Sequence, residues 1–234
     1  MGGSPLTSPG DERLVDITSA ALDGRLAGKS LGLRWLVDHG FRIPATWILV
    51  DPPRDEAETA DLLRSIIHPE RSYAVRSSAN VEDGGRVSYA GQFISVLGMQ
   101  GLDSVCAAVA DVVASADSAG ATSPRPPPHA ARTVTMTVLI QAMVEPAVSG
   151  VAFSKNPITG LNETVIEAVE GSGERLQTQG VTPARWVYRW GDLVERPDVA
   201  MLDDAQVMGI VGGVADIASA MSVPVDTEWV YDGT

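Results

Sequence analysis

The fold is decided by the stretch Tyr73-Ala74-Val75-Arg76-Ser77-Ser78-Ala79-Asn80-Val81-Glu82-Asp83. An apolar strand runs into an arginine and two serines, and a polar loop continues through Gly85. A forked guanidinium and hydroxyl groups at the mouth of a strand are typical of an anion-binding site, because ligands often bind where strands end. The alternative is an ordinary loop in which Arg76 pairs with Glu82 or Asp83.

Helical and extended patterns alternate on both sides of this stretch. In chain order they predict a helix over 31–39, a strand over 46–50, a helix over 56–67, strands over 73–75 and around 93–97, a helix over 101–116, strands over 134–144, 150–153, 164–169 and 185–190, a helix over 204–221 and a strand over 225–231. This order predicts an α+β fold.

A proline-rich segment divides the pattern into two halves. Residues 120–132 contain four prolines and cannot form a regular core element, so they predict a boundary between lobes. We therefore expect a flexible tail over 1–12, an N-terminal lobe over 13–125 and a C-terminal lobe over 126–234. Two α+β lobes with a cleft between them are the expected architecture.

Composition excludes several classes of protein. The chain has 234 residues, 17 basic and 30 acidic side chains and a formal charge of -13, so it is unsuited to general binding of nucleic acid. The single cysteine, Cys106, cannot form an internal disulfide, which fits a reducing cytoplasm. The amino terminus has no signal-peptide pattern and the chain no apolar run of membrane-spanning length, so neither secretion nor insertion is expected.

Only two of the basic residues are lysines, and one of them stands in an unusual place. Lys29 follows Gly28 at the start of a predicted helix, where a glycine allows close approach and free N–H groups favour anions. Phosphate is the expected ligand, although the glycine spacing is not that of a Walker motif. The alternative is a surface lysine. The other lysine, Lys155, follows the apolar strand that ends at Phe153.

Two further groups of residues could serve a nucleotide. The strand ending in Gln141-Ala142-Met143-Val144 offers backbone hydrogen bonds and an apolar face to a planar base, with plain core packing as the alternative. Carboxylates on apolar strands, among them Glu167 and Glu228, are costly unless they are paired, bind a metal or face solvent. Gly91, with Ser95 beyond it, fits a flexible lid over phosphates.

Taken together, these pieces resemble the nucleotide-binding domain of the phosphoenolpyruvate synthase and pyruvate phosphate dikinase family, whose ATP-grasp fold also occurs in rifampin phosphotransferases. The matching segments follow one another in the family's order over residues 24–231. They are Ala27-Gly28-Lys29, Ala74 to Ala79, Tyr89 to Gln92, Ile140 to Val144, Ser149 to Gly160, Ile166 to Ala168 and Glu228-Trp229.

The resemblance implies a role for each matched residue. It implies that Lys29 and Arg76 contact the phosphates of ATP and that Gly91 and Ser95 belong to the loop covering them. It further implies that Gln141, Ala142, Met143 and Val144 line the adenine pocket and that Glu228 is a magnesium ligand. Phosphoryl transfer needs positioning and charge neutralisation, which two cations and a carboxylate-held Mg²⁺ provide.

The sequence departs from the family in ways that predict a partner. No strand ending in Gln-x-Arg-Pro follows Glu228-Trp229, and His39, His68 and His129 do not lie in the family's Thr-Ser-His context. We therefore expect a separate domain or chain to carry the phosphohistidine and the acceptor-substrate site. Two alternatives stay open: a nucleotide-binding or interaction module without catalysis, and a stand-alone ATP-grasp ligase that forms an acyl phosphate.

Overall fold

The computed structural model describes residues 13–19, 22, 25–26, 28–79, 94–122, 136–173, 176 and 181–233. The chain divides into two compact units, Met1–Met143 (unit 1) and Val144–Thr234 (unit 2). Each unit is built on one antiparallel five-stranded sheet, so the α+β class is confirmed. The predicted tail over 1–12 lies outside the described residues.

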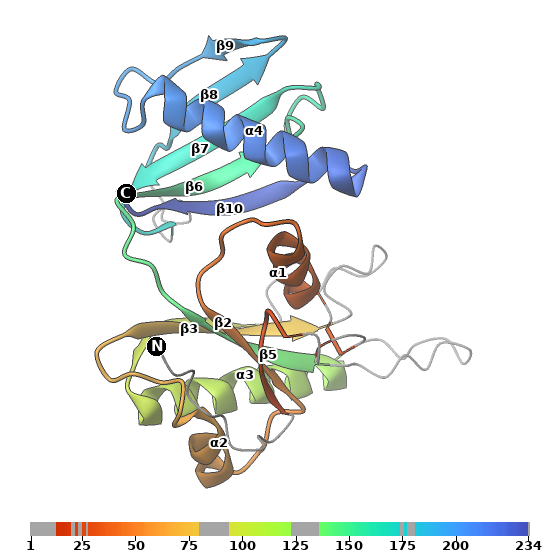
Figure 1. Cartoon of the computed structure of the whole chain (residues 1–234), viewed down its shortest axis with the longest axis vertical. Coiled ribbons are helices and arrows are strands. Elements are labelled where there is room, and N and C mark those ends of the chain that lie inside the picture. Colours follow the sequence, from red (N-terminus) through yellow and green to blue (C-terminus); the bar gives the residue numbers. More distant parts are fainter. Residues whose placement is uncertain are drawn as a thin grey trace, which may run out of the picture. The chain divides into compact units, whose positions relative to one another are not determined.

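Unit 1 contains a sheet, called sheet A, whose strand order is β1-β2-β5-β3-β4. The strands are β1 (Leu14–Asp16), β2 (Thr46–Val50), β3 (Ser72–Ala79), β4 (Ser95–Gln100) and β5 (Met136–Ala142). The helices are α1 (Lys29–Asp38), α2 (Glu56–Leu63) and α3 (Leu102–Thr122). Figure 1 shows α1 on one face of this sheet and α2 and α3 on the other.

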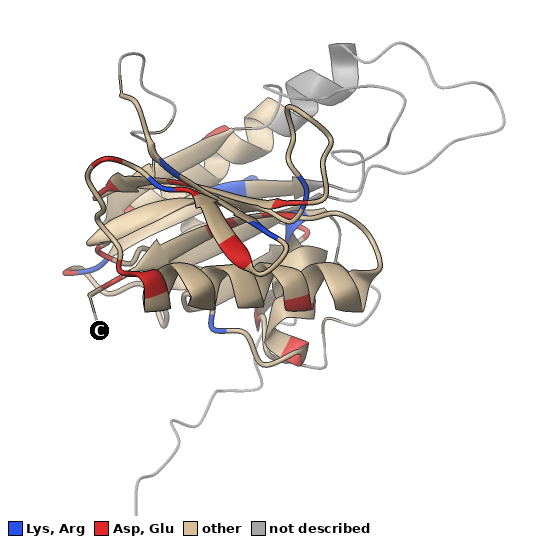
Figure 2. Ribbon diagram, turned by 90° about the horizontal axis from the view of Figure 1, so that it is seen from above, with Lys and Arg blue, Asp and Glu red and all other residues tan. Residues whose placement is uncertain are grey.

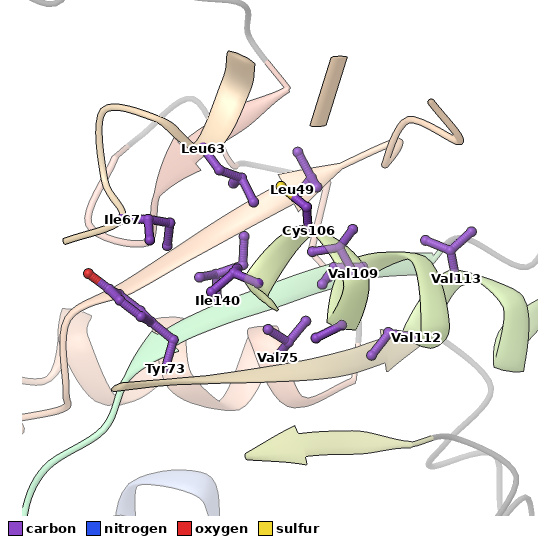
Figure 3. Packing of buried hydrophobic residues seen from close by; sticks show 13 residues of the cluster. Leu49, Leu63, Ile67, Tyr73, Val75, Cys106, Val109, Val112, Val113 and Ile140 are labelled. Atoms are coloured by element: carbon purple, nitrogen blue, oxygen red, sulfur yellow. The ribbon is translucent and has the colours of Figure 1, made fainter. Parts of the chain in front are cut away.

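The face toward α2 and α3 holds the largest hydrophobic cluster. In Figure 3, Cys106 and Val109 of α3 point toward strand residues that include Val75 and Ile140. Tyr73 lies at one end of this cluster, where its hydroxyl donates to the carbonyl of Ile66 at 3.0 Å. Burial raises the pKa of the Cys106 thiol above its ordinary value, because the low-dielectric core disfavours the thiolate, and nearby carboxylates add to the shift.

The opposite face packs against α1. Ile48, Val50 and Leu139 are buried there with partly buried Leu33 and Val37 of the helix. Strand residues two apart share a face, so β2, β3 and β5 each send alternate side chains toward α1. Half of the residues of β2, β3 and β5 therefore face α1, and the other half face α2 and α3.

Unit 2 contains sheet B, with strand order β10-β6-β7-β8-β9. Its strands are β6 (Val148–Phe153), β7 (Thr164–Glu170), β8 (Ala184–Arg189), β9 (Asp192–Glu195) and β10 (Asp226–Tyr231). Helix α4 (Asp204–Met221) packs its buried Val207, Val211 and Val214 against one face, where Ile166 and Trp186 lie. A capping box at Asp203 and Gln206 begins the helix, because each side chain accepts a backbone N–H of the other.

The boundary between the units differs from the one predicted at 125/126. Strand β5 pairs with β2 on one side and β3 on the other, so residues 136–142 lie in the middle of sheet A. The structural boundary therefore follows Met143. Proline content alone did not locate this boundary, because strand pairing decides which unit a strand belongs to.

Basic residues are almost absent from the helices. Of the four described helices only α1 carries any, Lys29 and Arg34, whereas α2, α3 and α4 carry acidic residues alone (Figure 2). The described basic side chains therefore gather on strands, loops and α1. Within the described part of the chain, no helix has both the length and the apolar character needed to span a membrane.

Candidate functional site

Strand pairing brings three of the predicted residues to one face of sheet A. Arg76 of β3 lies opposite Leu139 of β5 and opposite Ser95 of β4. Directly paired residues of antiparallel strands send their side chains to the same face, and Leu139 is buried in the cluster that packs against α1. Arg76, which is partly buried, and Ser95, which is exposed, therefore lie on the α1 face.

Gln141 lies on this face as well, in a fixed orientation. It pairs in register with Thr46 and Ala74, and its Nε2 donates to Thr46 Oγ1 at 2.9 Å. Thr46 Oγ1 donates in turn to the carbonyl of Pro44 at 2.8 Å. The Gln141 side chain is thus held by a buried hydroxyl that sequence reasoning did not single out.

The other residues predicted for a base pocket follow Gln141 along the chain. Ala142 packs in the cluster beneath α3, and its N–H donates to the carbonyl of Ala45 at 2.8 Å. The N–H of Met143 donates to the carbonyl of Ser72 at 2.8 Å, and 39% of Met143 is exposed. Both amides thus make hydrogen bonds within the protein, while Val144 begins unit 2.

Lys29 is the first residue of α1, whose amino-terminal end contacts β3. The helix begins after Gly28, which has φ 49° and ψ -127° and offers no side chain as a cap. The backbone N–H of Ser30 instead donates to Ser78 Oγ at 3.0 Å, and Ser78 Oγ donates to Ser30 Oγ at 3.3 Å. Both serines are fully buried. The start of α1 is thereby attached to the strand that carries Arg76.

Glu228 lies in unit 2, on the central stretch of β10. It is exposed and stands opposite Val151 of β6, which stands opposite Glu167 of β7. Glu167 lies 3.7 Å from the Arg185 Nε, and Arg185 binds both oxygens of Glu195 at 2.7 Å. A row of charged residues thus crosses one face of sheet B.

Trp229 packs on the other face of sheet B, over a glycine. It pairs with Gly150, and a Cβ at that glycine would lie 2.6 Å from the indole Cζ2 and against the carbonyl of Glu167. Only glycine fits beneath this ring, which fixes the position of β10 and so of its neighbour Glu228.

Lys155 stands at a different place in unit 2. It lines a hollow of about 550 Å³ with Tyr188, Arg189, Trp190 and the carboxyl end of α4, and Glu228 is not among the lining residues. Arg189 Nη1 lies 3.5 Å from the buried Glu163, and its guanidinium stacks 4.8 Å from the Trp190 ring.

Neither the glycine of the predicted phosphate-covering loop nor a cluster of metal ligands is found among the described residues. Gly91 lies outside the described residues, as does most of the polar loop after Ala79. Within the described part of the chain, no group of three His, Cys, Asp or Glu side chains is placed to hold a metal ion. The roles of Lys29, Arg76, Ser95, Gln141 and Glu228 stay predictions, which their geometry makes specific enough to test.

Comparison with known proteins identifies the family. Residues 56–193 match the model of the pyruvate phosphate dikinase AMP/ATP-binding domain. This match covers more than half of the chain. The chain belongs to the family of pyruvate phosphate dikinase AMP/ATP-binding domains. The resemblance inferred from the sequence motifs is thus confirmed, and the coarse function of this domain family is ATP binding.

Curated relatives of this dikinase-type domain agree with the match. A rifampicin phosphotransferase of a Streptomyces species is 31% identical in an alignment of 210 positions that covers 77% of this chain and 24% of the relative. A phosphoenolpyruvate synthase of Aeropyrum pernix is 38% identical over 58% of this chain and 17% of its own length. A probable phosphoenolpyruvate synthase of Staphylothermus marinus is 36% identical over 76% and 20%. The chain thus spans about a quarter or less of these relatives.

Proposed function

We propose that this chain binds Mg-ATP through Lys29 and Arg76 and supplies the nucleotide for phosphoryl transfer to a histidine on a separate domain or chain. The observation that carries the proposal is the shared face of sheet A. Arg76, Ser95 and Gln141 lie on the face against which α1 packs, and the first residue of that helix is Lys29. Membership of a family of AMP/ATP-binding domains supports the choice of ligand.

The two cations suit a triphosphate in different ways. A lysine provides a compact charge on a flexible stem, whereas an arginine provides a planar fork that binds two oxygens at once. A cation at the first position of a helix also adds to the partial positive charge of the free N–H groups there. Gly91 and Ser95 would belong to the loop that covers the phosphates.

The adenine ring would bind at the carboxyl end of β5. Because the N–H groups of Ala142 and Met143 already donate to backbone carbonyls, the base would find its apolar contact in the Met143 side chain and its hydrogen bonds at Val144 and at free carbonyl lone pairs. Gln141, oriented by Thr46, would lie beside the ring.

Glu228 would hold the magnesium ion. Mg²⁺ in nucleotide sites is bound through one or two carboxylates together with the substrate phosphates, so it needs no larger cluster of protein ligands. The exposed Glu228 and Asp226, two residues apart on β10, fit this donor set. When bound, the ion neutralises phosphate charge.

The acceptor would come from outside the described chain. Because the chain spans a quarter or less of its relatives, a domain or partner chain carrying the histidine is part of the proposal. The imidazole nitrogen would attack phosphorus, the P–O bond to the nucleotide would break, and the leaving phosphate oxygen would keep the electron pair. Lys29 and Arg76 would offset the charge on the transferred group.

Titration calorimetry with Mg-ATP tests the nucleotide site. Lys29→Met and Arg76→Met should each weaken binding by about tenfold or more, which corresponds to roughly 1.4 kcal/mol for a charged hydrogen bond. Arg64→Met is the matched control, because Arg64 is an exposed arginine of unit 1 that pairs with Asp61 at the end of α2. Equal affinity in all three variants and the wild type would refute the site.

A transfer assay tests the reaction. The chain is incubated with labelled ATP, Mg²⁺ and candidate proteins that carry a phosphohistidine domain, and acid-labile label on the acceptor is the expected result. Tight ATP binding without transfer to any acceptor would favour a non-catalytic nucleotide-binding module. Positional isotope exchange in ATP that depends on a carboxylic acid would favour a ligase instead.

A further inference from the structure

Helix α1 is capped by a residue of a strand rather than by the residue that precedes the helix. The first turn of a helix leaves backbone N–H groups without intrahelical partners, and a Ser, Thr, Asp or Asn before the helix usually accepts one of them. Here the preceding residue is Gly28, which makes no side-chain cap. Ser78, 48 residues away on β3, accepts the N–H of Ser30 at 3.0 Å in its place.

The contact between Ser30 and Ser78 is fully buried. Ser30 and Ser78 both have no exposed surface, and their hydroxyls lie 3.3 Å apart, with Ser78 as the donor. A buried N–H that loses its acceptor cannot turn to water without opening the structure. The first turn of α1 is therefore held at one point on β3.

The point of attachment lies next to Arg76. Ser78 and Arg76 are two residues apart on one strand, so their side chains leave the same face about 7 Å apart. Lys29 precedes Ser30 directly, and its Cα lies about 3.8 Å from that of Ser30. The serine contact thus fixes the distance between the stems of the two cations that the proposed function assigns to phosphate.

We propose that Ser78 is a positioning residue that holds Lys29 beside Arg76. This inference rests on the proposed function, since it names how that same site is assembled. Without the Ser78 hydroxyl the first turn of α1 would fray, and the Lys29 ammonium would spend less time at the distance from Arg76 that suits one triphosphate. The Arg76 side chain, which belongs to the strand itself, would stay in place.

A double-mutant cycle on the full 234-residue chain tests the inference, with Mg-ATP affinity measured by displacement of a fluorescent ATP analogue. Ser78→Ala should weaken Mg-ATP binding about tenfold in the wild-type background, and less than twofold when Lys29→Met is already present, because residues that act through one another are not additive. Thr59→Val is the matched control. It removes another buried hydroxyl of unit 1, which donates at 2.9 Å to the carbonyl of Asp55, the N-cap residue of α2, and it should leave affinity unchanged.

Hydrogen exchange gives a readout that needs no ligand. The Ser30 amide should be protected in the wild type and should lose at least tenfold of its protection in Ser78→Ala, while α2 amides keep theirs. Should Ser78→Ala fail to fold, Ser78→Cys serves as the second variant, because sulfur keeps the shape but accepts hydrogen bonds weakly. Its effects should run in the same direction.

The outcomes separate the two claims. A wild type that binds no Mg-ATP overturns the proposed function and this inference with it. A wild type that binds, combined with an equal loss from the Ser78 change in both lysine backgrounds, overturns the positioning role alone. So does a Ser30 amide that exchanges as fast as a frayed end.

Discussion

The two sheets of this chain differ in how many charged residues their strands carry. In sheet A, helices cover both faces, and the central strands β2, β5 and β3 carry one charged residue, Arg76. In sheet B, where α4 covers one face, β7, β8, β9 and β10 carry eight charged residues, and several of these pair with one another. Burying a charge is costly, so a charge in sheet A is stronger evidence of function than one in sheet B.

The comparison is sharpest at two aliphatic residues that stand beside these charges. Leu139→Ala should lower the free energy of unfolding of unit 1 by about 4 kcal/mol, because a fully buried leucine leaves a cavity in a core closed on both sides. Val151→Ala, between Glu167 and Glu228 in sheet B, should cost about 1 kcal/mol, since Val151 is only partly buried. Chemical denaturation measures both, and equal losses would contradict the contrast.

Close packing on the α4 side of sheet B gives the next largest effect. Gly150→Ala should destabilise unit 2 by about 3 kcal/mol, because the added methyl would collide with the Trp229 ring and a backbone carbonyl. Gly212→Ala in α4 is the control, since that glycine has open space around it and alanine favours helix by about 0.5–1 kcal/mol. If Gly150→Ala unfolds at the wild-type denaturant concentration, the ring is not held as described.

Helices α2 and α4 have a side-chain cap on the residue that precedes them, whereas α1 has none, and this difference can be measured. Asp203→Ala should destabilise unit 2 by about 1 kcal/mol, because α4 loses its capping box. Asp55→Ala should cost unit 1 a similar amount, about 1 kcal/mol, since Asp55 Oδ1 accepts the N–H of Glu58 at 2.9 Å. Gly28→Ser, at a residue with positive φ, should not stabilise α1. A clear gain from that change would show that a local cap can replace Ser78.

The charged row of sheet B should contribute little to stability. Arg185→Met should cost about 0.5 kcal/mol, because its carboxylate partners, Glu167 and Glu195, keep access to solvent and salt screens such pairs. The loss should shrink further in 1 M salt. Thermal unfolding at two salt concentrations measures it, and a loss of several kcal/mol that salt does not change would place these charges in a dry interior.

The smallest expected effect concerns pH. The raised pKa of the Cys106 thiol means that the folded chain releases this proton less readily than the unfolded chain. Stability from this group is therefore complete below the thiol pKa of the unfolded chain and is lost as pH rises through and above that value. Cys106→Ala should remove this part of the slope. Identical pH profiles for the two proteins would contradict the assignment.

Sequence patterns predicted the elements where periodicity was strong. The strand at Thr46–Val50 and the helix at Asp204–Met221 agree with expectation to the residue. Strand β3 is longer than predicted, because Arg76, Ser77 and Ser78 are polar residues that resemble a loop yet pair with β5 as far as Ala79. Strands β1 and β9 were missed, since three or four residues are too few to show alternation.

The candidate site shows the same division. Motifs indicated Lys29, Arg76 and Glu228, because charged residues next to glycines or on apolar strands stand out in one dimension. They marked the Ser78 hydroxyl as part of an anion-binding stretch but did not indicate that Ser78 caps α1 or that Thr46 orients Gln141, because these contacts join residues 48 and 95 positions apart. The available signal was the alternation of side chains along a strand, which places Ser78 on the same face as Arg76. It gains meaning only once α1 is known to lie on that face.

The central place of β5 governs how this protein can be made. Sheet A is complete only when residues 136–142 enter between β2 and β3, so a chain emerging from the ribosome carries two half-sheets with open edges until about residue 142 is released. A chain truncated at residue 125 would lack β5, so the edges of β2 and β3 would stay unpaired and prone to aggregation. A stable isolated N-terminal piece must therefore extend at least to Met143.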